Sequence, residues 1–123
     1  MHQQATDYAA AASSHQQALK LFCDASNQLG QAATLNNLGL LAARTADPGK
    51  ASRHYSQALA ITRGINAPAE QARALEGLGK LHLQNGDHDQ AVSHLRQALT
   101  IYQRAGTPAD VQRIQENLRR HER

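Results

Sequence analysis

Aromatic residues make up only 3% of the 123-residue chain, and it has a single cysteine, Cys23. One cysteine cannot form an intramolecular disulfide and, without partner ligands, does not make a zinc site. The longest apolar run, near residues 38–43, falls far short of the roughly 20 residues of a membrane span, and no secretory leader pattern opens the chain. These absences predict a soluble protein of a reducing compartment, the cytoplasm.

Proline and glycine, at three and eight residues, are too few for a disordered or collagen-like chain. Alanine and leucine are abundant instead, bring the hydrophobic fraction to 41%, and suit closely packed helices. The formal net charge of +3 is small, and a basic C-terminal stretch is more typical of a solvated helix face than of nucleic-acid contact. The composition predicts one all-α domain, and we do not expect direct binding to nucleic acid.

The residues that could carry chemistry form no recognisable site. Cys23 has no histidine or asparagine at a known catalytic spacing, and the GLG of residues 77–79 lacks the strand and the GK[ST] sequence of a phosphate loop. The seven histidines contain no HExxH pattern, and we expect His54 and His94 to be solvated or at a helix edge. The sequence therefore predicts no enzyme, no metal site and no cofactor.

The strongest feature of the sequence is an internal repeat with a period of 40 residues. The segments HQQALKLF, YSQALAIT and LRQALTIY begin at residues 15, 55 and 95, and residues 31–70 share 15 identities with residues 71–110 when aligned without a gap. Self-similarity of this kind is typical of solenoids built from stacked helix pairs.

Each period contains two helical patterns. Leucines recur every three residues in the first, helix A, near 31–44 and 70–85, and residues 108–121 match the same pattern with Val111, Ile114 and Leu118. Small and apolar residues recur at i, i+4 and i+7 in the second, helix B, near 48–64 and 88–105. The single domain of residues 1–123 thus divides into a half repeat with helix B at 1–29, repeats at 30–68 and 69–107, and a half repeat with helix A at 108–123.

Turn residues mark where these helices begin. Asp47 and Asp87 are predicted N-caps, because a carboxylate there can accept the free amides of the first turn. Pro48 would then occupy the first helical position, where its missing amide is not needed, and Pro68 and Pro108 would begin the next helices.

The spacing of these residues resembles the tetratricopeptide repeat. LNNLG at 35–39 and LEGLG at 75–79 supply its Leu-Gly, and the second helix is matched by Asp47, Ala51, Tyr55 and Ala58 and by Asp87, Ala91, Leu95 and Ala98. The resemblance implies a right-handed α-solenoid of about six antiparallel helices in the order B-A-B-A-B-A. The sequence departs from the usual residues at Ala42, Ala46 and His82.

The period of 40 is longer than the usual one of about 34 residues. Such repeats are similar to those of kinesin light chain and the LGN family, and more similar to the C-terminal arrays of bacterial SARP-type and STAND regulators. This resemblance implies a non-catalytic protein-interaction module, the C-terminal sensor or regulatory part of a bacterial transcriptional regulator. The alternative is an architectural or oligomerisation segment of a longer superhelix with no groove ligand.

A second face of helix A is the expected binding groove. Asn36, Leu40 and Arg44 recur at i, i+4 and i+8 on a face distinct from the packing leucines. In the resembling families the asparagines of LNNLG contact the peptide backbone, which implies that role for Asn36 and Asn37. Basic residues on this face favour an acidic protein or peptide partner. The expected groove residues are Asn36, Asn37, Leu40, Arg44, Arg73, Glu76, Lys80 and Gln84.

Small residues should let the two helices of a pair approach closely, with Gly39 against Ala51 and Gly79 against Ala91. A leucine at position 39 would overpack this crossing by roughly 1–3 kcal/mol. The first helix has no helix A before it, so its apolar side, with Ala11, Ala18 and Phe22, is expected to be open. That open side predicts self-association through an end of the molecule.

Overall fold

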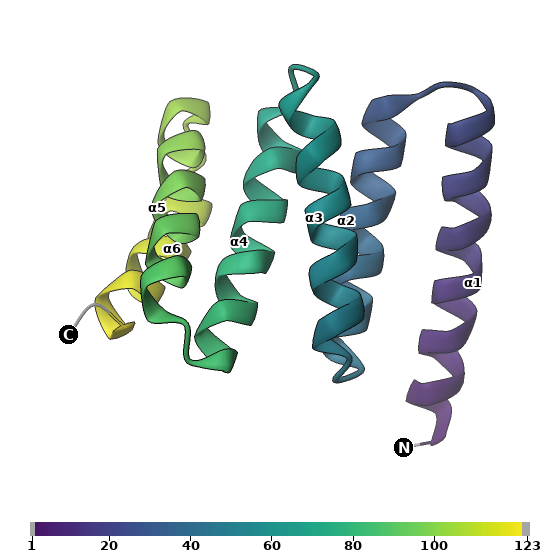
Figure 1. The fold of residues 1–123 in the computed structure, drawn as a ribbon, viewed down its shortest axis with the longest axis horizontal. Helices are drawn as coiled ribbons and strands as arrows, with labels where there is room; N and C mark the ends of the chain where they lie inside the picture. The colour runs from purple at the N-terminus through teal and green to yellow at the C-terminus, as the bar shows by residue number, and fades with distance from the viewer. Residues whose placement is uncertain (1, 122–123) are drawn as a thin grey trace.

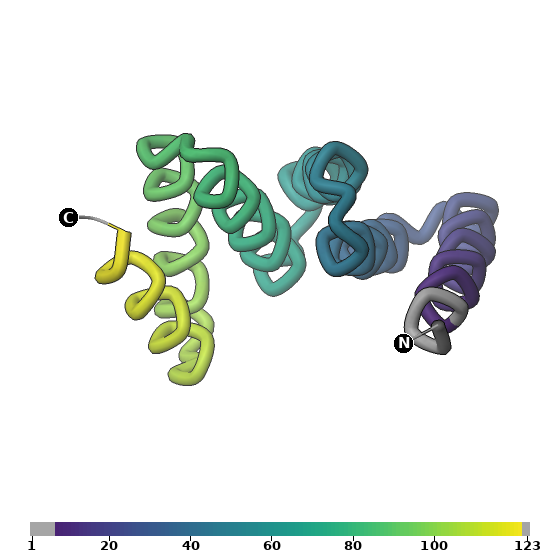
Figure 2. The backbone as a smooth tube through the Cα atoms, turned by 90° about the horizontal axis from the view of Figure 1, so that it is seen from below, coloured from purple at the N-terminus to yellow at the C-terminus, as the bar shows by residue number. Residues whose placement is uncertain are grey.

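The computed structural model describes the backbone of residues 2–121 and the side chains of residues 7–121. All regular structure in this part of the chain is α-helical, and the helices stand side by side in chain order, with α1 and α6 at opposite ends (Figures 1 and 2). The helices are α1 His2–Asp24, α2 Gln28–Arg44, α3 Pro48–Arg63, α4 Pro68–Asn85, α5 His88–Ala105 and α6 Pro108–His121.

Two helix pairs, α2 with α3 and α4 with α5, form the most extensive contacts. The contacts of α1 with α2, α3 with α4 and α5 with α6 join these pairs into one stack, and α2 also touches α4 directly. Helix α1 is therefore a B helix without its A partner, and α6 is an A helix without its B partner. The predicted all-α solenoid with the order B-A-B-A-B-A is confirmed.

The helix starts follow the predicted turn chemistry, with one exception. The Asp47 side chain accepts the amide of Lys50 at 3.2 Å and Pro48 opens α3, as expected. Asp87 occupies the N-cap position of α5, but its side chain makes no capping bond. It accepts from the Asn85 side chain at 2.9 Å instead, so the expectation of a carboxylate cap at Asp87 was wrong.

Two repeat-equivalent turns have the same backbone shape but different residues. Gly86 follows α4 with φ of 83°, in the left-handed region where glycine has no steric penalty. Ala46, 40 residues earlier, has φ of 59°. The substitution of alanine for the usual turn glycine therefore leaves the turn intact but strained.

Alanines and leucines fill the interior. Ala51, Ala58, Ala72, Ala91 and Ala98 have no exposed surface, which lets the helix backbones lie close together. Side chains this small fill the interior without voids only if the helices approach closely, which leaves little room for aromatic rings. The low aromatic content of the sequence agrees with this packing.

Tyr55 is the exception among these small core residues. Its ring lies between Gly39 of α2 and Gly77 of α4, and a methyl group built at Gly39 would stand 2.8 Å from Cε1 of that ring. The expected partner of Gly39 was Ala51, which is one turn too early on α3. Gly79 is similar, since its nearest neighbour is Leu95, with the carbonyl oxygen of Ala91 farther away at 3.4 Å.

The two ends of the stack differ in polarity. At the α1 end Leu21 is 68% exposed and Leu29 is 54% exposed, whereas Phe22, expected to be open, packs over Gly30. At the α6 end Gln115 and Arg119 are exposed, at the positions equivalent to the buried Leu75 and Gly79. The α1 end therefore exposes more apolar surface than the α6 end.

Candidate functional site

A groove of about 620 Å³ runs along the A helices α2, α4 and α6. Tyrosines from the two intervening B helices, Tyr55 and Tyr102, complete its lining. The structure brings these residues of the expected groove together there: Asn36, Leu40, Arg44, Arg73, Glu76, Lys80 and Gln84. Asn37 lies beside the groove and reaches it only through its contact with Arg73.

Asn36 and Asn37 hold helix α2 against the first turns of α4. The Nδ2 of Asn36 donates to the backbone oxygen of Glu70 at 2.9 Å and to its Oε1 at 3.1 Å. Arg73 donates to the same Oε1 at 2.8 Å and to Oδ1 of Asn37 at 2.8 Å. Both asparagines therefore already have partners within the chain. Asn36 has no exposed surface, which sequence reasoning did not anticipate, and only its Oδ1 lacks a hydrogen bond in the described structure.

Glu76 makes the corresponding link one repeat later, from α4 to α6. Its Oε2 accepts from Nε of Arg113 at 2.7 Å, and its Oε1 accepts from Nη2 of Arg113 at 2.9 Å and from the Tyr102 hydroxyl at 3.0 Å. The ammonium of Lys80 lies 3.4 Å away, and Arg113 also pairs with Asp110 at 2.7 Å. Glu76, at 7% exposed, is thus the centre of a network rather than a free ligand group.

These surroundings decide the charge state of Glu76. Burial acts most strongly and disfavours the carboxylate, but the hydrogen bonds and charge of Arg113, the charge of Lys80 and the Tyr102 hydroxyl together outweigh it. The pKa of Glu76 is therefore below its ordinary value, and the side chain stays ionised at neutral pH. Burial raises the pKa of Tyr102, and Glu76 raises it further, because the phenolate would lie next to that carboxylate.

The period of 40 residues explains why the two links correspond. Position 76 is equivalent to position 36, and the pair Asp110 and Arg113 is equivalent to the pair Glu70 and Arg73. Sequence reasoning missed Arg113 and Asp110 because it carried the groove only through the two complete repeats. Extending the same offset onto α6 would have found both residues.

The open part of the groove is basic and partly apolar. Arg44 is exposed in the last turn of α2 and has no ion-pair partner among the described side chains. Lys80 keeps half of its side chain exposed in spite of its contact with Glu76, and Leu40 is 39% exposed. These side chains, with the exposed Gln84, are available to a partner without breaking the links between helices.

The described residues hold no group of three or more histidine, cysteine or acidic side chains that could bind a metal ion. The histidines differ from one another: the Nδ1–H of His94 donates to the Gln90 backbone oxygen at 2.8 Å, and the ring lies against His82, with ring centroids 5.1 Å apart. Its repeat equivalent, His54, has both ring nitrogens covered. The His54 residue as a whole is half-buried, which agrees with the expected position at a helix edge.

Six helices stacked as A and B pairs, with a groove along the A helices, define an α-helical solenoid repeat protein. Two family models described as tetratricopeptide repeat match the sequence, one over residues 1–64 and the other over residues 71–105. The chain belongs to the tetratricopeptide repeat family. No curated protein matches the sequence. No helix within the described residues has the length and apolarity that crossing a membrane requires.

Proposed function

We propose that this chain is a non-catalytic interaction module whose groove binds an acidic peptide segment or an acidic surface of a partner protein. Tetratricopeptide repeats in general mediate protein–protein interaction, and the family assignment supports that part directly. The observation that carries the rest is the pair of exposed cations, Arg44 and Lys80, on the same open groove as Leu40.

The charges that line the groove favour this partner. Four basic side chains, Arg44, Arg73, Lys80 and Arg113, stand against two acidic ones, Glu76 and Asp110. Arg73 and Arg113 are held by carboxylates of the chain itself, and Lys80 shares Glu76 with Arg113, so the excess positive charge is mainly at Arg44, with the half-exposed Lys80 beside it. An acidic segment would be attracted to these cations when bound. Its association rate would also be higher, most clearly at low salt.

The polar side chain of Gln84 suits hydrogen bonding to the backbone of an extended peptide. The amide of Gln84 can donate and accept at once, which matches the alternating amides and carbonyls of a peptide. Asn36, Asn37 and Glu76 then act by fixing the A helices that form the walls. The exposed part of Leu40 offers an apolar contact for a side chain between two acidic residues.

Charge reversal at Arg44 tests the proposal. A display library of random 12-residue peptides, selected on the wild-type protein, should yield sequences rich in aspartate and glutamate. For a selected peptide, Arg44→Glu should lower the affinity roughly fivefold or more, because it replaces an attraction of up to about 1 kcal/mol with a repulsion. Isothermal titration calorimetry at low salt measures the change.

Arg63→Glu is the matched control. Arg63 is also an exposed arginine in the last turn of its helix, and it lies outside the groove. Both substitutions place the same unfavourable charge at a helix C-terminus, so their effects on stability should be alike. Peptides without acidic enrichment, or equal losses of affinity for the two variants, would contradict the groove assignment.

The wider role we propose is the C-terminal sensor or regulatory part of a bacterial transcriptional regulator. This proposal rests on the resemblance of the 40-residue repeats to the arrays of such regulators. A DNA-binding or nucleotide-binding domain encoded next to this segment in its parent gene would support it, and a parent without either would oppose it.

Self-association through the α1 end is a second candidate, favoured by the exposed Leu21 and Leu29 near the turn that joins α1 to α2. On that reading the chain is an architectural piece whose contacts run through an end. Sedimentation at high concentration should show a dimer or larger species that Leu21→Glu shifts toward monomer. The control Leu40→Glu, in the groove, should leave the distribution unchanged, and a strictly monomeric wild type would exclude this candidate.

A further inference from the structure

A second cavity, of about 550 Å³, lies on the opposite face of α2 from the groove. Its base is apolar and comes from Leu38, Leu41 and Ala42 of α2 and from Ala9 and Ala12 of α1. The two cavities share no lining residue, because positions 38, 41 and 42 face away from positions 36, 40 and 44 around the helix. This outer cavity has the size and the mainly apolar lining of a small-molecule site.

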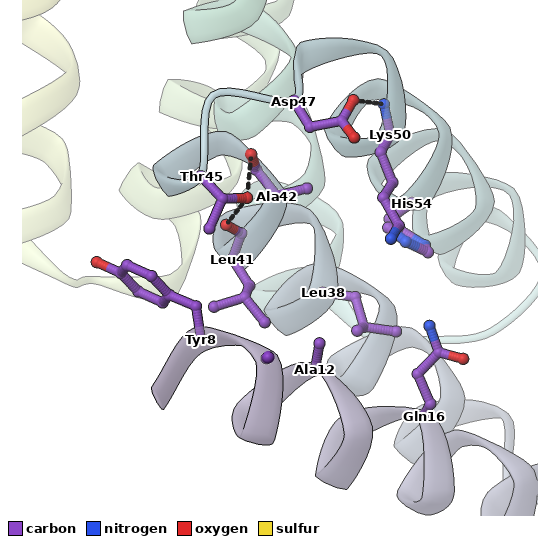
Figure 3. Close-up of a pocket in the computed structure, with 11 residues that line it drawn as sticks. Tyr8, Ala12, Gln16, Leu38, Leu41, Ala42, Thr45, Asp47, Lys50 and His54 are labelled. Carbon is purple, nitrogen blue, oxygen red and sulfur yellow. Dashed lines mark hydrogen bonds between the residues drawn. The ribbon is translucent and has the colours of Figure 1, made fainter. Parts of the chain in front are cut away.

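Polar side chains stand around this base and differ between its two ends (Figure 3). Because the helices run antiparallel, Tyr8, Thr45 and Asp47 lie toward one end and Gln16 and His54 toward the other. At the first end, Thr45 and Asp47 already form hydrogen bonds within the chain. Thr45 donates to the oxygens of Leu41 and Ala42, both at 3.1 Å, and Asp47 caps α3.

The other end differs, because within the part of the chain that the structure describes His54 there lacks a hydrogen bond and the neighbouring Lys50 lacks an ion pair. Neither ring nitrogen of His54 has a hydrogen-bond partner among the described residues, although both nitrogens are covered. Burial lowers the pKa of His54, the charges of Lys50 and Arg53 lower it further, and the Gln57 side chain acts in the opposite direction. The Lys50 ammonium, one turn away, has no carboxylate within ion-pair distance among the described side chains.

We propose that this outer cavity binds a small apolar carboxylic acid. The hydrocarbon part covers Leu38, Leu41 and Ala12, and the carboxylate pairs with Lys50 at the end of the cavity that His54 lines. The single carboxylate of the lining, Asp47, is two helical turns from His54 and does not oppose the head group. A neutral ligand would leave Lys50 unpaired, and a cationic one would meet it directly, so the charge selects the class.

Octanoate is the probe for this site, with octanol and octylammonium as probes of equal chain length and different charge. Titration of the ¹⁵N-labelled full chain should show saturable binding of octanoate, with backbone shifts at residues 38, 41, 50 and 54. Octanol should bind at least fivefold more weakly and octylammonium more weakly still. Absence of octanoate binding, equal binding of octanol, or shifts confined to the peptide groove would overturn the proposal.

Two substitutions separate ligand contact from folding. Lys50→Gln, at an exposed position, should lower octanoate affinity about fivefold without changing the melting temperature. His54→Leu should raise the melting temperature of the free protein, because it removes covered polar atoms without a hydrogen bond in the described structure, and should leave the octanoate affinity nearly unchanged. The control His94→Leu changes the repeat-equivalent histidine, which already has partners, and should leave octanoate binding unchanged. Octanoate binding unaffected by Lys50→Gln would contradict the assignment.

Discussion

Gly77→Ala should lower the free energy of unfolding by about 2 kcal/mol, although alanine is the better helix former by about 1 kcal/mol. The added methyl group would stand 2.6 Å from two ring carbons of Tyr55, which is far inside van der Waals contact. The ring is 6% exposed and is bounded by Gly39 on another helix, so it has little room to retreat. Urea denaturation followed by circular dichroism measures the loss.

A double-mutant cycle identifies Tyr55 as the cause. In a Tyr55→Leu background the ring is absent, and Gly77→Ala should become neutral or stabilising by up to about 1 kcal/mol. Gly49→Ala is the control in the wild type, because a methyl group there meets no atom within 4 Å. If Gly77→Ala cost the same with and without the Tyr55 ring, the close packing of α3 between α2 and α4 would not be the reason.

Glu76→Ala should destabilise the protein by about 2 kcal/mol, below the 3–5 kcal/mol typical of a fully buried pair, because the Arg113 side chain keeps 42% of its surface exposed. The substitution removes the acceptor of Arg113 and Tyr102 and loosens α6 from α4. Glu116 is the repeat equivalent of Glu76 but is exposed, so Glu116→Ala should change stability by less than about 0.5 kcal/mol.

The contribution of Glu76 should also depend on pH. Its pKa is lowered in the folded protein, so the stabilisation is complete above the ordinary value of 4.5 and is lost as the pH falls through the folded value. The stability difference between the wild type and Glu76→Gln should therefore shrink between pH 6 and pH 3. A difference that stays constant over this range would show that the charge of Glu76 does not hold the network.

The fold could be predicted because its information is local and repeated. The leucine spacing of each A helix, the prolines at positions 48, 68 and 108 and the small residues of each B helix all act within one or two turns. The helices consequently begin and end close to their predicted bounds. The predicted cap at Asp87 was wrong, because capping requires the carboxylate to point at the first amides of the helix. Asn85 and His82 contact that carboxylate instead.

For the candidate site, the sequence could predict which face of each A helix lines the groove, but not which of its side chains are already hydrogen-bonded within the chain. The positions that line the groove follow from helical periodicity, but the state of each side chain depends on the neighbouring repeat. Asn36 was expected to offer its amide to a partner, and the structure gives that amide to Glu70, 34 residues away. Arg113 joins the groove through its hydrogen bonds to Glu76, 37 residues away, which the 40-residue offset points to but no local pattern of α6 reveals.

The sequence by itself determined the family, the helix count and order, and the two faces of each A helix, because periodicity and turn residues are properties of neighbouring positions in the chain. Only the tertiary structure decided which polar side chains form hydrogen bonds within the chain and which remain exposed. Asn36 and Glu76 became links between helices, Arg44 and Lys80 kept exposed surface, and the ring nitrogens of His54 are covered without gaining a hydrogen bond from the described residues. Hydrogen bonding and desolvation depend on atoms brought together from different helices, and these distances are set by packing rather than by spacing along the chain.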